Sequence, residues 1–385
     1  MMKIPYGRQT ITDSDIAAVV DVLKSDYLTQ GPKIPEFEKM VAAYHGAKYA
    51  VAFSNGTAAL HAAYHALGVT DGDEIITSPI TFSATANAAV YLGGKPVFAD
   101  IDPATNCIDI DGIEERITPR TKVIAPVSFG GYPVDLKRVA ALAKKHGVRV
   151  LHDAAHAIGS RRDGTFGMEY ADIAILSFHP VKHIATGEGG MALTNDAAVY
   201  QSLQLFRSHG ITKAPELLSE NHGPWYYEMI SLGYNYRITD IQAALGISQF
   251  ARIGENLRAR NKAAKYYTES LADYDGIELP PSLGFDSIEN GGADTVHAYH
   301  LFTVRVADPR RRPDMYRYLH EHGVLAQVHY IPVHLLPYYK KRFGYAKGDF
   351  PEAEKFYEAE LSIPMFHGIS EAEREYVAGT IRAYG

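Results

Sequence analysis

One lysine of this chain stands in an unusual sequence environment. Lys182 lies within Ser177–His183, which follows the apolar run Ile173–Leu176 and leads into the glycine-rich Gly187–Gly190. Most lysines project into water, so a single lysine says little about chemistry. Lys182 becomes informative because other segments supply the groups that a reactive amine would need.

Two other segments offer an acid and an anion-binding loop. Asp153 follows the strand-like run Val148–Leu151 and stands among small residues, where a carboxylate is costly to bury without a cation or a donor. The segment Ser54–Ala59 lies between a predicted strand and a predicted helix. Free backbone N–H groups and the helix dipole can hold a phosphate dianion at such a place, although the segment lacks the pattern of a Walker loop.

A lysine amine, a strand-end carboxylate and a phosphate cradle are together what pyridoxal phosphate requires of a protein. Phe82, soon after the predicted strand Ile75–Thr77, could stack on the pyridine ring, although a core aromatic would give the same pattern. Ser177 could donate its hydroxyl to the phosphate, or it could cap the end of its strand. We therefore expect pyridoxal 5'-phosphate as the cofactor.

Four motifs in the same order resemble those of the sugar-nucleotide aminotransferases, the DegT/DnrJ/EryC1/StrS family of fold-type I pyridoxal-phosphate enzymes. They are Ser54–Leu60, Asp153–His156, Ser177–Gly190 and Gly233–Arg237, and the resemblance covers roughly residues 3–380. It implies an α/β fold with a mainly parallel central sheet, flanking helices and a smaller C-terminal α+β domain. Members with histidine at the position of Lys182 dehydrate sugars, whereas this chain keeps the lysine.

The resemblance also implies roles for individual residues. Lys182 would bind the coenzyme as a Schiff base, and Asp153 would pair with the pyridinium nitrogen. The other implied cofactor contacts are Gly56, Thr57 and Ser177 at the phosphate, Phe82 over the ring, His156 beside Asp153, and Asn235. Similar enzymes are homodimers in which Asn235, together with Arg237, reaches into the partner subunit's site.

The substrate is a finer question. The segments Phe206–Ile211 and Leu325–Pro332, with Ser177–His179, look most like the branch that aminates UDP-4-keto-6-deoxy-N-acetyl-β-L-altrosamine, a step toward pseudaminic acid, with L-glutamate as donor. In that branch the resemblance places substrate contacts on Tyr6, Asp26, Tyr27, Leu28, Thr29, Thr57, Ser177, Asn235, Gln327, Val328, His329 and Tyr330. A D-configured 4-keto-6-deoxy sugar or a 4-keto-arabinose would need only modest changes around these segments.

The elements that position these residues are predicted from alternation of strand-like and helix-like runs. A helix is expected over 13–25, and Gly46 is expected to end the next one. The alternation then continues through Tyr49–Phe53, Thr57–Leu67, Glu74–Thr77, Ser83–Leu92, Pro96–Asp100, Asp109–Ile117, Lys122–Val127, Leu136–His146 and Arg149–His152. This pattern favours parallel βαβ units with both faces of the sheet covered. Because ligands gather at the carboxyl ends of such strands, positions 54–57, 77–82 and 152–156 are predicted to share one pocket.

A long helical stretch over about 238–270 is followed by a connection rich in proline, glycine and aspartate at 279–294. We therefore predict a large PLP-binding α/β domain over residues 13–250 and a small C-terminal domain over 251–385. Residues 1–12 could pack on the small domain.

Composition limits the protein class. The chain has 385 residues, of which 38 are lysine or arginine and 45 are aspartate or glutamate, so its net charge of −7 indicates neither a nucleic-acid nor a membrane surface. No apolar run approaches the ~18 residues of a membrane helix. Cys107 is the only cysteine, which excludes an internal disulfide and favours a reducing compartment. With no leader-like segment at the N-terminus, we expect a cytoplasmic protein.

Two rival functions use the same residues differently. A metal hydrolase could use His179 with His183, or His152 with His156, since each pair is four residues apart. Pro180 interrupts the first pair and neither matches the HExxH pattern, so no metal is expected. A non-catalytic regulator of the same family would have little reason to keep the lysine, the aspartate and the phosphate loop together.

Overall fold

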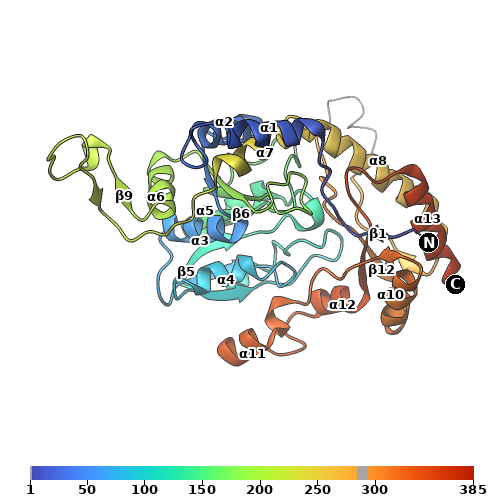
Figure 1. Ribbon diagram of the computed structural model, residues 1–385. Coiled ribbons are helices and arrows are strands. Elements are labelled where there is room, and N and C mark those ends of the chain that lie inside the picture. Colours follow the sequence, from blue (N-terminus) through green and yellow to red (C-terminus); the bar gives the residue numbers. More distant parts are fainter. Residues whose placement is uncertain (1, 284–293) are drawn as a thin grey trace.

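The computed structural model describes residues 2–283 and 294–385, and its centre is a seven-stranded sheet (Figure 1). The strand order is β2 (Tyr49–Phe53), β8 (Gly190–Thr194), β7 (Ile173–Ser177), β6 (Arg149–Asp153), β5 (Thr121–Ala125), β3 (Glu74–Thr77) and β4 (Lys95–Phe98). Neighbouring strands are parallel, except that β8 runs antiparallel to both β2 and β7. The predicted mainly parallel sheet is confirmed.

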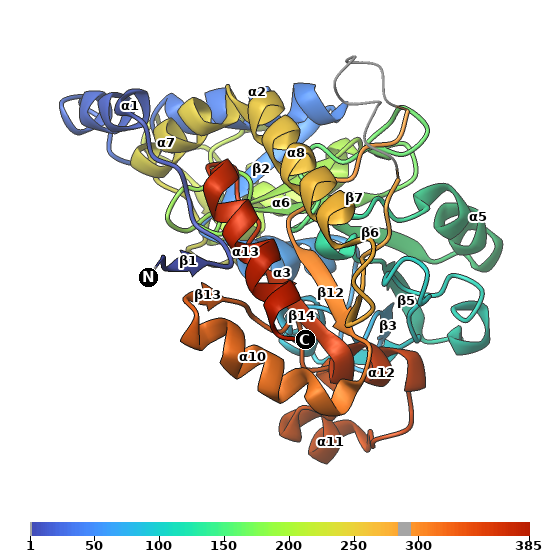
Figure 2. The ribbon, with the colours of Figure 1, turned by 90° about the vertical axis from the view of Figure 1, so that its right-hand side faces the viewer.

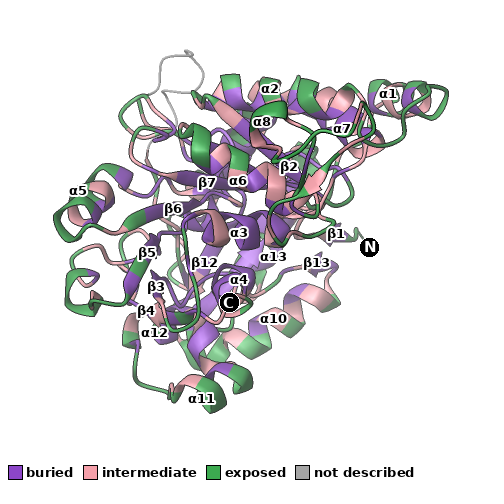
Figure 3. Cartoon of the chain, turned by 90° about the vertical axis from the view of Figure 1, so that its left-hand side faces the viewer, coloured by how far each residue is buried: buried purple, intermediate pink, exposed green. Residues whose placement is uncertain are grey.

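Helices cover both faces of this sheet. On one face lie α2 (Lys33–His45), α7 (Asp240–Phe250) and the start of α8 (Ile253–Leu271); on the other lie α3 (Gly56–Ala66), α4 (Ala84–Val90) and α6 (Ala197–Arg207). Successive side chains of a strand point to opposite faces. Ile175 accordingly packs with the α3 side and Leu176 with the α2 side. Figure 3 shows the strands of the sheet as buried.

A second, smaller sheet lies in the C-terminal part of the chain. It is antiparallel, in the order β11 (Ile277–Glu278), β12 (Phe302–Val306) and β14 (Glu360–Ile363). Figure 2 shows α8, α10 (Arg312–Glu321) and α13 (Glu371–Ala383) beside it. Their shared core includes Tyr267, Phe302 and Leu319. Near the N-terminus, β1 (Ile4–Pro5) pairs in parallel with β13 (Val324–Leu325), so the first residues lie against this part.

Several predicted elements are confirmed with their boundaries nearly unchanged. A helix, α1 (Asp13–Leu23), begins at the predicted residue, and Gly46 ends α2 with φ of 70°, a left-handed conformation that favours glycine. The strands at Tyr49–Phe53 and Glu74–Thr77 and the helix α5 (Leu136–His146) coincide with their predictions.

The helix predicted over Asp109–Ile117 is wrong. Only a 3₁₀ turn, η1 (Glu114–Arg116), forms there. The backbone before this turn forms a loop, because Ile108 pairs with Ile101 in an isolated β-bridge and the N–H of Asp109 donates to the carbonyl of Asp100. Gly112 further disfavours a helix at its middle.

A further difference concerns a longer segment. The stretch predicted to be helical over 238–270 divides into α7 and α8 near Arg252, whose guanidinium binds Asp15 of α1 at 2.8 Å. The division lets α7 pack on α1 and α2 while α8 runs on to the core of the small sheet. The connection predicted at 279–294 lies mostly outside the described residues, since 284–293 are not among them. The sequence pattern also did not predict strand β8.

An arm formed by residues 208–234 extends away from the main body in Figure 1. Its short strands β9 (Ile211–Thr212) and β10 (Glu228–Met229) pair with each other. Trp225 and Leu232 on this arm are about 70% exposed (71% and 70%), which is unusual for such large apolar side chains. Among the helices of the described residues, none has the length and apolar character needed to cross a membrane.

Candidate functional site

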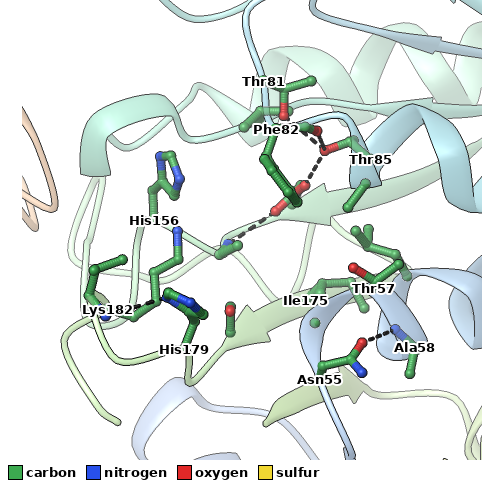
Figure 4. A pocket seen from close by; sticks show the side chains of 18 of the residues that line it. Asn55, Thr57, Ala58, Thr81, Phe82, Thr85, His156, Ile175, His179 and Lys182 are labelled. Atoms are coloured by element: carbon green, nitrogen blue, oxygen red, sulfur yellow. Dashed lines mark hydrogen bonds between the residues drawn. The ribbon is translucent and has the colours of Figure 1, made fainter. Parts of the chain in front are cut away.

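A cavity of about 750 Å³ opens at the carboxyl ends of the parallel strands (Figure 4). The three predicted segments meet here, because Asn55, Gly56 and Thr57, then Thr81 and Phe82, then Asp153, Ala155 and His156 all line it. Lys182 and Ser177 line it as well. The prediction that positions 54–57, 77–82 and 152–156 share one pocket is therefore confirmed.

Lys182 enters the cavity from the loop between β7 and β8. Figure 4 shows its side chain extending towards His156. Its Nζ lies 3.2 Å from Nε2 of His300. Burial lowers the pKa of the Lys182 amine to about 7, an effect that Arg260 reinforces and Asp153 opposes. At neutral pH a large fraction of this amine therefore carries a lone pair, which both a nucleophile and a base require.

Asp153 stands at the end of β6, almost fully buried. Its Oδ2 accepts a hydrogen bond from the Thr85 hydroxyl at 2.7 Å, and its Oδ1 accepts one from the N–H of Ala155 at 3.1 Å. Burial raises the pKa of the Asp153 carboxyl. Within the described parts of the chain no cation forms an ion pair with Asp153, so the site fits a ligand that brings a positive charge to this carboxylate.

The start of α3 forms the predicted anion-binding loop. Asn55 caps the helix, its Oδ1 accepting from the N–H of Ala58 at 2.8 Å. The N–H groups of Gly56 and Thr57 lie in the first turn, where no helical carbonyl precedes them. Glycine at position 56 leaves room beside Ser177, because a Cβ there would lie 3.3 Å from the serine Cβ.

Gly190 permits this loop to approach the sheet. A Cβ on Gly190 would lie 2.5 Å from the carbonyl carbon of Asn55 and 2.6 Å from the nitrogen of Gly56, distances that no real side chain tolerates. The glycine-rich run after Lys182 therefore has a steric purpose, which is close contact between β8 and the loop at the start of α3.

Aromatic and imidazole rings form the remaining walls. Phe82 is 58% exposed into the cavity region, with its ring centroid 6.0 Å from that of Tyr330, so it is not a core aromatic. Nδ1 of His156 accepts from the N–H of Gly130 at 3.3 Å. Burial holds the pKa of His156 well below its usual value, so the ring is neutral and its Nε2–H donates to the Tyr330 hydroxyl at 3.2 Å.

His329 is oriented by a chain of hydrogen bonds. The Ser362 hydroxyl donates to Glu360 at 2.5 Å and therefore accepts from Nδ1–H of His329 at 2.8 Å. Burial lowers the pKa of His329 to about 3, so the ring is neutral. Its Nε2 lone pair is left to accept a hydrogen bond from a ligand.

Not every predicted contact lies at the cavity of one chain. Of the predicted substrate contacts, Tyr6, Thr57, Ser177, His329 and Tyr330 line it. Asp26, Tyr27, Leu28, Thr29, Asn235, Gln327 and Val328 do not, and all of these except Val328 are exposed. Their roles stay predictions, and so does that of Arg237.

Two residues with direct contacts to the central groups were missed. Thr85 binds Asp153 from α4, and its place one helical turn after Thr81 and close to Phe82 could have indicated it. His300, beside Lys182, lies 118 residues further along the chain, and no local motif marks it.

The histidine pairs that suggested a metal have other partners. Nε2 of His183 bonds the Ala298 carbonyl at 2.7 Å, and Nε2 of His152 bonds the Ser128 hydroxyl at 2.8 Å. The described part of the chain holds no group of three histidine, cysteine, aspartate or glutamate side chains arranged around a common point.

The donor set fits pyridoxal phosphate. A buried carboxylate without a cation suits the pyridinium nitrogen, the first turn of α3 suits the phosphate, and an amine whose pKa is lowered suits the aldehyde. Each of these features is a property of the chain itself, and all three open into one cavity.

Comparison with known proteins places this site in a family. The sequence matches the DegT/DnrJ/EryC1/StrS aminotransferase family over residues 9–382. It is 39% identical over 383 residues to the spore coat polysaccharide biosynthesis protein SpsC of Bacillus subtilis, covering 98% of this chain and 96% of that protein. It is 35% identical over 384 residues to the UDP-4-amino-4,6-dideoxy-N-acetyl-beta-L-altrosamine transaminase of Campylobacter jejuni, covering 98% and 96%.

A solved structure agrees with both the fold and the family. PseC of Helicobacter pylori, an aminotransferase involved in the biosynthesis of pseudoaminic acid, superposes with a TM-score of 0.88 at 32% identity, covering 98% of each chain. Pyridoxal phosphate is the coenzyme of these aminotransferases. The predicted fold type, cofactor and enzyme class are thereby confirmed, and the chain belongs to the DegT/DnrJ/EryC1/StrS family of pyridoxal-phosphate-dependent sugar aminotransferases.

Proposed function

We propose that this enzyme transfers an amino group from L-glutamate to C4 of UDP-4-keto-6-deoxy-N-acetyl-β-L-altrosamine, a step of pseudaminic acid biosynthesis. The observation that carries the chemistry is the presence of Lys182 and Asp153 in one cavity that also holds the first turn of α3. The choice of sugar is supported by similarity to the Campylobacter jejuni transaminase and to PseC of Helicobacter pylori.

The chain's own residues would divide the work of transamination. When bound, pyridoxal phosphate supplies an aldehyde that takes up the amino group and a ring that delocalises negative charge. Asp153 holds a proton on the ring nitrogen through a charge-assisted hydrogen bond. The Lys182 amine, with its pKa near 7, can accept a proton from a substrate carbon and later return it, which is typically worth ~10²–10⁴ in rate.

The cavity offers suitable surfaces for a sugar. Its volume of about 750 Å³ falls in the range of roughly 300–1,000 Å³ that is usual for small-molecule sites. Tyr6 and Tyr330 give aromatic faces for a sugar ring, and Nε2 of His329 can accept a hydrogen bond from a sugar hydroxyl. Asp153 and Lys182 line the same cavity, so these groups could contact the part of the substrate that reacts.

We also propose that the active form is a homodimer with shared sites. Asn235 is exposed and lies outside the cavity of its own chain, at the root of the arm 208–234 that exposes Trp225 and Leu232. A second copy that covered these apolar side chains would explain their exposure. It would also bring Asn235 towards a neighbouring cavity.

The test offers L-glutamate with either the L-altro or the D-gluco form of the UDP-4-keto-6-deoxy-N-acetyl sugar and measures the aminated products by mass spectrometry. We expect product from the L-altro form at a kcat/KM at least tenfold higher than from the D-gluco form. A preference for the D-gluco form would overturn the proposed substrate while leaving the sugar aminotransferase class intact.

A half-reaction separates catalysis from a purely regulatory role. Glutamate alone should replace the visible absorbance of the lysine-bound coenzyme with the absorbance of the aminated coenzyme. One equivalent of 2-oxoglutarate should form for each coenzyme converted. The absence of this conversion, in protein that has bound the coenzyme, would favour a non-catalytic regulator.

A further inference from the structure

His300 contacts the reactive amine from a distant part of the chain. It precedes β12, is 3% exposed, and places Nε2 3.2 Å from Nζ of Lys182. Its ring lies 4.3 Å from the ring of His156 and 5.9 Å from that of His183, measured between centroids. Lys182 therefore faces a set of buried imidazoles in addition to Asp153.

The other ring nitrogen of His300 determines which hydrogen bond is favourable. Nδ1 is buried and has no hydrogen-bond partner among the described residues. If Lys182 were an ammonium, it would have to donate to Nε2, and the ring proton would sit on Nδ1 as a buried N–H without an acceptor. Such an unpaired donor costs about 1–3 kcal/mol.

The opposite arrangement avoids that cost. If Lys182 is a neutral amine, Nε2–H of His300 donates to its lone pair, and Nδ1 keeps only a lone pair. Unpaired buried acceptors are better tolerated than unpaired N–H donors. The geometry around His300 thus favours the free base of Lys182.

The surrounding charges act in the same direction, with one exception. Arg260 on α8 is 1% exposed, and its guanidinium donates to the carbonyls of Tyr299 and Met365; no carboxylate of the described residues pairs with it. This buried cation disfavours a second cation at Lys182.

The imidazoles that face the amine carry no charge, since burial lowers their pKa values. They are His156, His179, His183, His300 and His329. Asp153 is the opposing group that favours the ammonium.

We propose that His300 is a positioning residue whose Nε2–H donates to the neutral amine of Lys182 and presents that amine ready for the coenzyme. This rests on Lys182 being the lysine that binds pyridoxal phosphate. In that binding step the amine nitrogen bonds to the aldehyde carbon, and the carbonyl oxygen leaves as water with the two amine hydrogens. Only the free base can begin this step, so His300 affects how fast coenzyme-free enzyme captures the coenzyme.

Two amide substitutions separate this role from simple packing. In His300→Gln the amide nitrogen takes the position of Nε2 and can still donate to Lys182, whereas in His300→Asn it takes the position of Nδ1 and cannot. Both replacements are polar and smaller than histidine. His297→Asn is the matched control, because His297 is equally buried and its Nδ1 accepts from the N–H of Tyr299, but it does not contact Lys182.

The first readout uses coenzyme-free protein. The pH dependence of Lys182 acetylation by a trace of acetic anhydride, followed by peptide mass spectrometry, gives the midpoint at which the amine becomes reactive. We expect His300→Asn to raise that midpoint by about half to one pH unit, because the neutral amine loses its donor. His300→Gln and His297→Asn should stay near the wild type.

The second readout is the rate of capture of pyridoxal phosphate at pH 7, followed by stopped-flow absorbance. It should fall about two- to fivefold in His300→Asn, in proportion to the lost free base, and should stay near the wild-type value in the other two variants. Equal midpoints and rates in His300→Asn and wild type would overturn the proposal, as would equal shifts in the Gln and Asn variants. If borohydride failed to fix the coenzyme on Lys182 of the wild type, the role of Lys182 itself would fail, which is a separate result.

Discussion

Lys182 and Asp153 share a cavity without forming an ion pair. Each is shifted by burial towards its neutral form, since the pKa of the lysine is lowered and that of the aspartate is raised. A direct ion pair would hold both groups charged and bound to each other. Their separation leaves room for a ligand that carries its own cation towards Asp153 and its own electrophile towards Lys182.

Replacement of the lysine tests this assignment at the residue scale. Lys182→Met protein incubated with pyridoxal phosphate should show no visible absorbance of lysine-bound coenzyme and nothing that borohydride fixes, because thioether sulfur cannot form the C=N bond. Lys33→Met, at a partly exposed site at the start of α2 outside the cavity, should behave as wild type. A normal, reducible absorbance in Lys182→Met would remove the lysine from its role.

The carboxylate has both a catalytic and a stability consequence. Asp153→Asn should fold and yet lose at least about a hundredfold in turnover, because a neutral amide does not hold the ring proton. In coenzyme-free wild type the raised pKa means that the native state binds the proton more tightly than the unfolded state. Stability is therefore lost as pH rises from the unfolded value of 3.8 through the raised native value.

Thermal unfolding of the coenzyme-free proteins checks the direction of this pH dependence. The unfolding temperature of Asp153→Asn minus that of wild type should be more positive at pH 7 than at pH 4, since the amide does not titrate. Turnover close to the wild-type value would show that another group protonates the ring nitrogen, and a difference independent of pH would contradict the buried-carboxylate argument.

Sequence reasoning located the residues that lie next to their strands and missed those that only tertiary structure brings in. Asp153 and Ser177 end strands, and Thr57 lies in the first turn of a helix, so alternation of elements placed them correctly. His300 carries no such signal, because its significance depends on the loop before β12 folding back onto the large sheet. Only the exposure of Phe82 in the structure excludes the alternative that it is a core aromatic.

At the scale of elements, short regular segments were predictable and breaks in them were not. The helix at Leu136–His146 has an apolar stripe and the cap Asp135, both readable from sequence. The division of α7 from α8 depends on which core each half reaches, and β8 depends on pairing with β2 and β7. Such long-range pairings leave little trace in a local pattern.

The contact between β8 and the loop before α3 can be tested through its glycine. Gly190→Ala should lose about 1–3 kcal/mol of stability, because its Cβ meets the backbone of Asn55 and Gly56. The displaced first turn of α3 should also weaken coenzyme binding about tenfold or more. Equilibrium unfolding and a coenzyme titration measure the two effects.

Gly379→Ala is the matched control for that substitution. Position 379 lies within α13, and a Cβ there has nothing within 4 Å. It should gain about 0.5–1 kcal/mol and leave coenzyme binding unchanged, as expected for glycine removed from a helix. Equal behaviour of the two alanine variants would contradict the close approach at Gly190.

At the scale of the whole molecule, the proposed homodimer with shared active sites makes a prediction about mixtures. Lys182→Met and Asn235→Ala should each be nearly inactive as homodimers. After the two are unfolded and refolded together, half of the dimers should be mixed, and one site in each mixed dimer should combine an intact Lys182 with an intact Asn235. Activity should then recover to about a quarter of the wild-type value.

Sedimentation of the same samples provides the control, because the recovered activity must run with the dimer. If mixing restores nothing although mixed dimers form, Asn235 does not serve the partner's site. Recovery in a monomeric fraction would contradict the homodimer itself.

The antiparallel direction of β8 has a mechanical consequence for Lys182. The loop that carries it leaves the sheet at Ser177 and returns at Gly190, and these two residues pair with each other across the strands. The pairing of two strands of the central sheet therefore holds the loop together at its base. A movement of the facing rim, which carries Phe82 and Tyr330, would therefore change access to the cavity without displacing the base of the loop that carries Lys182.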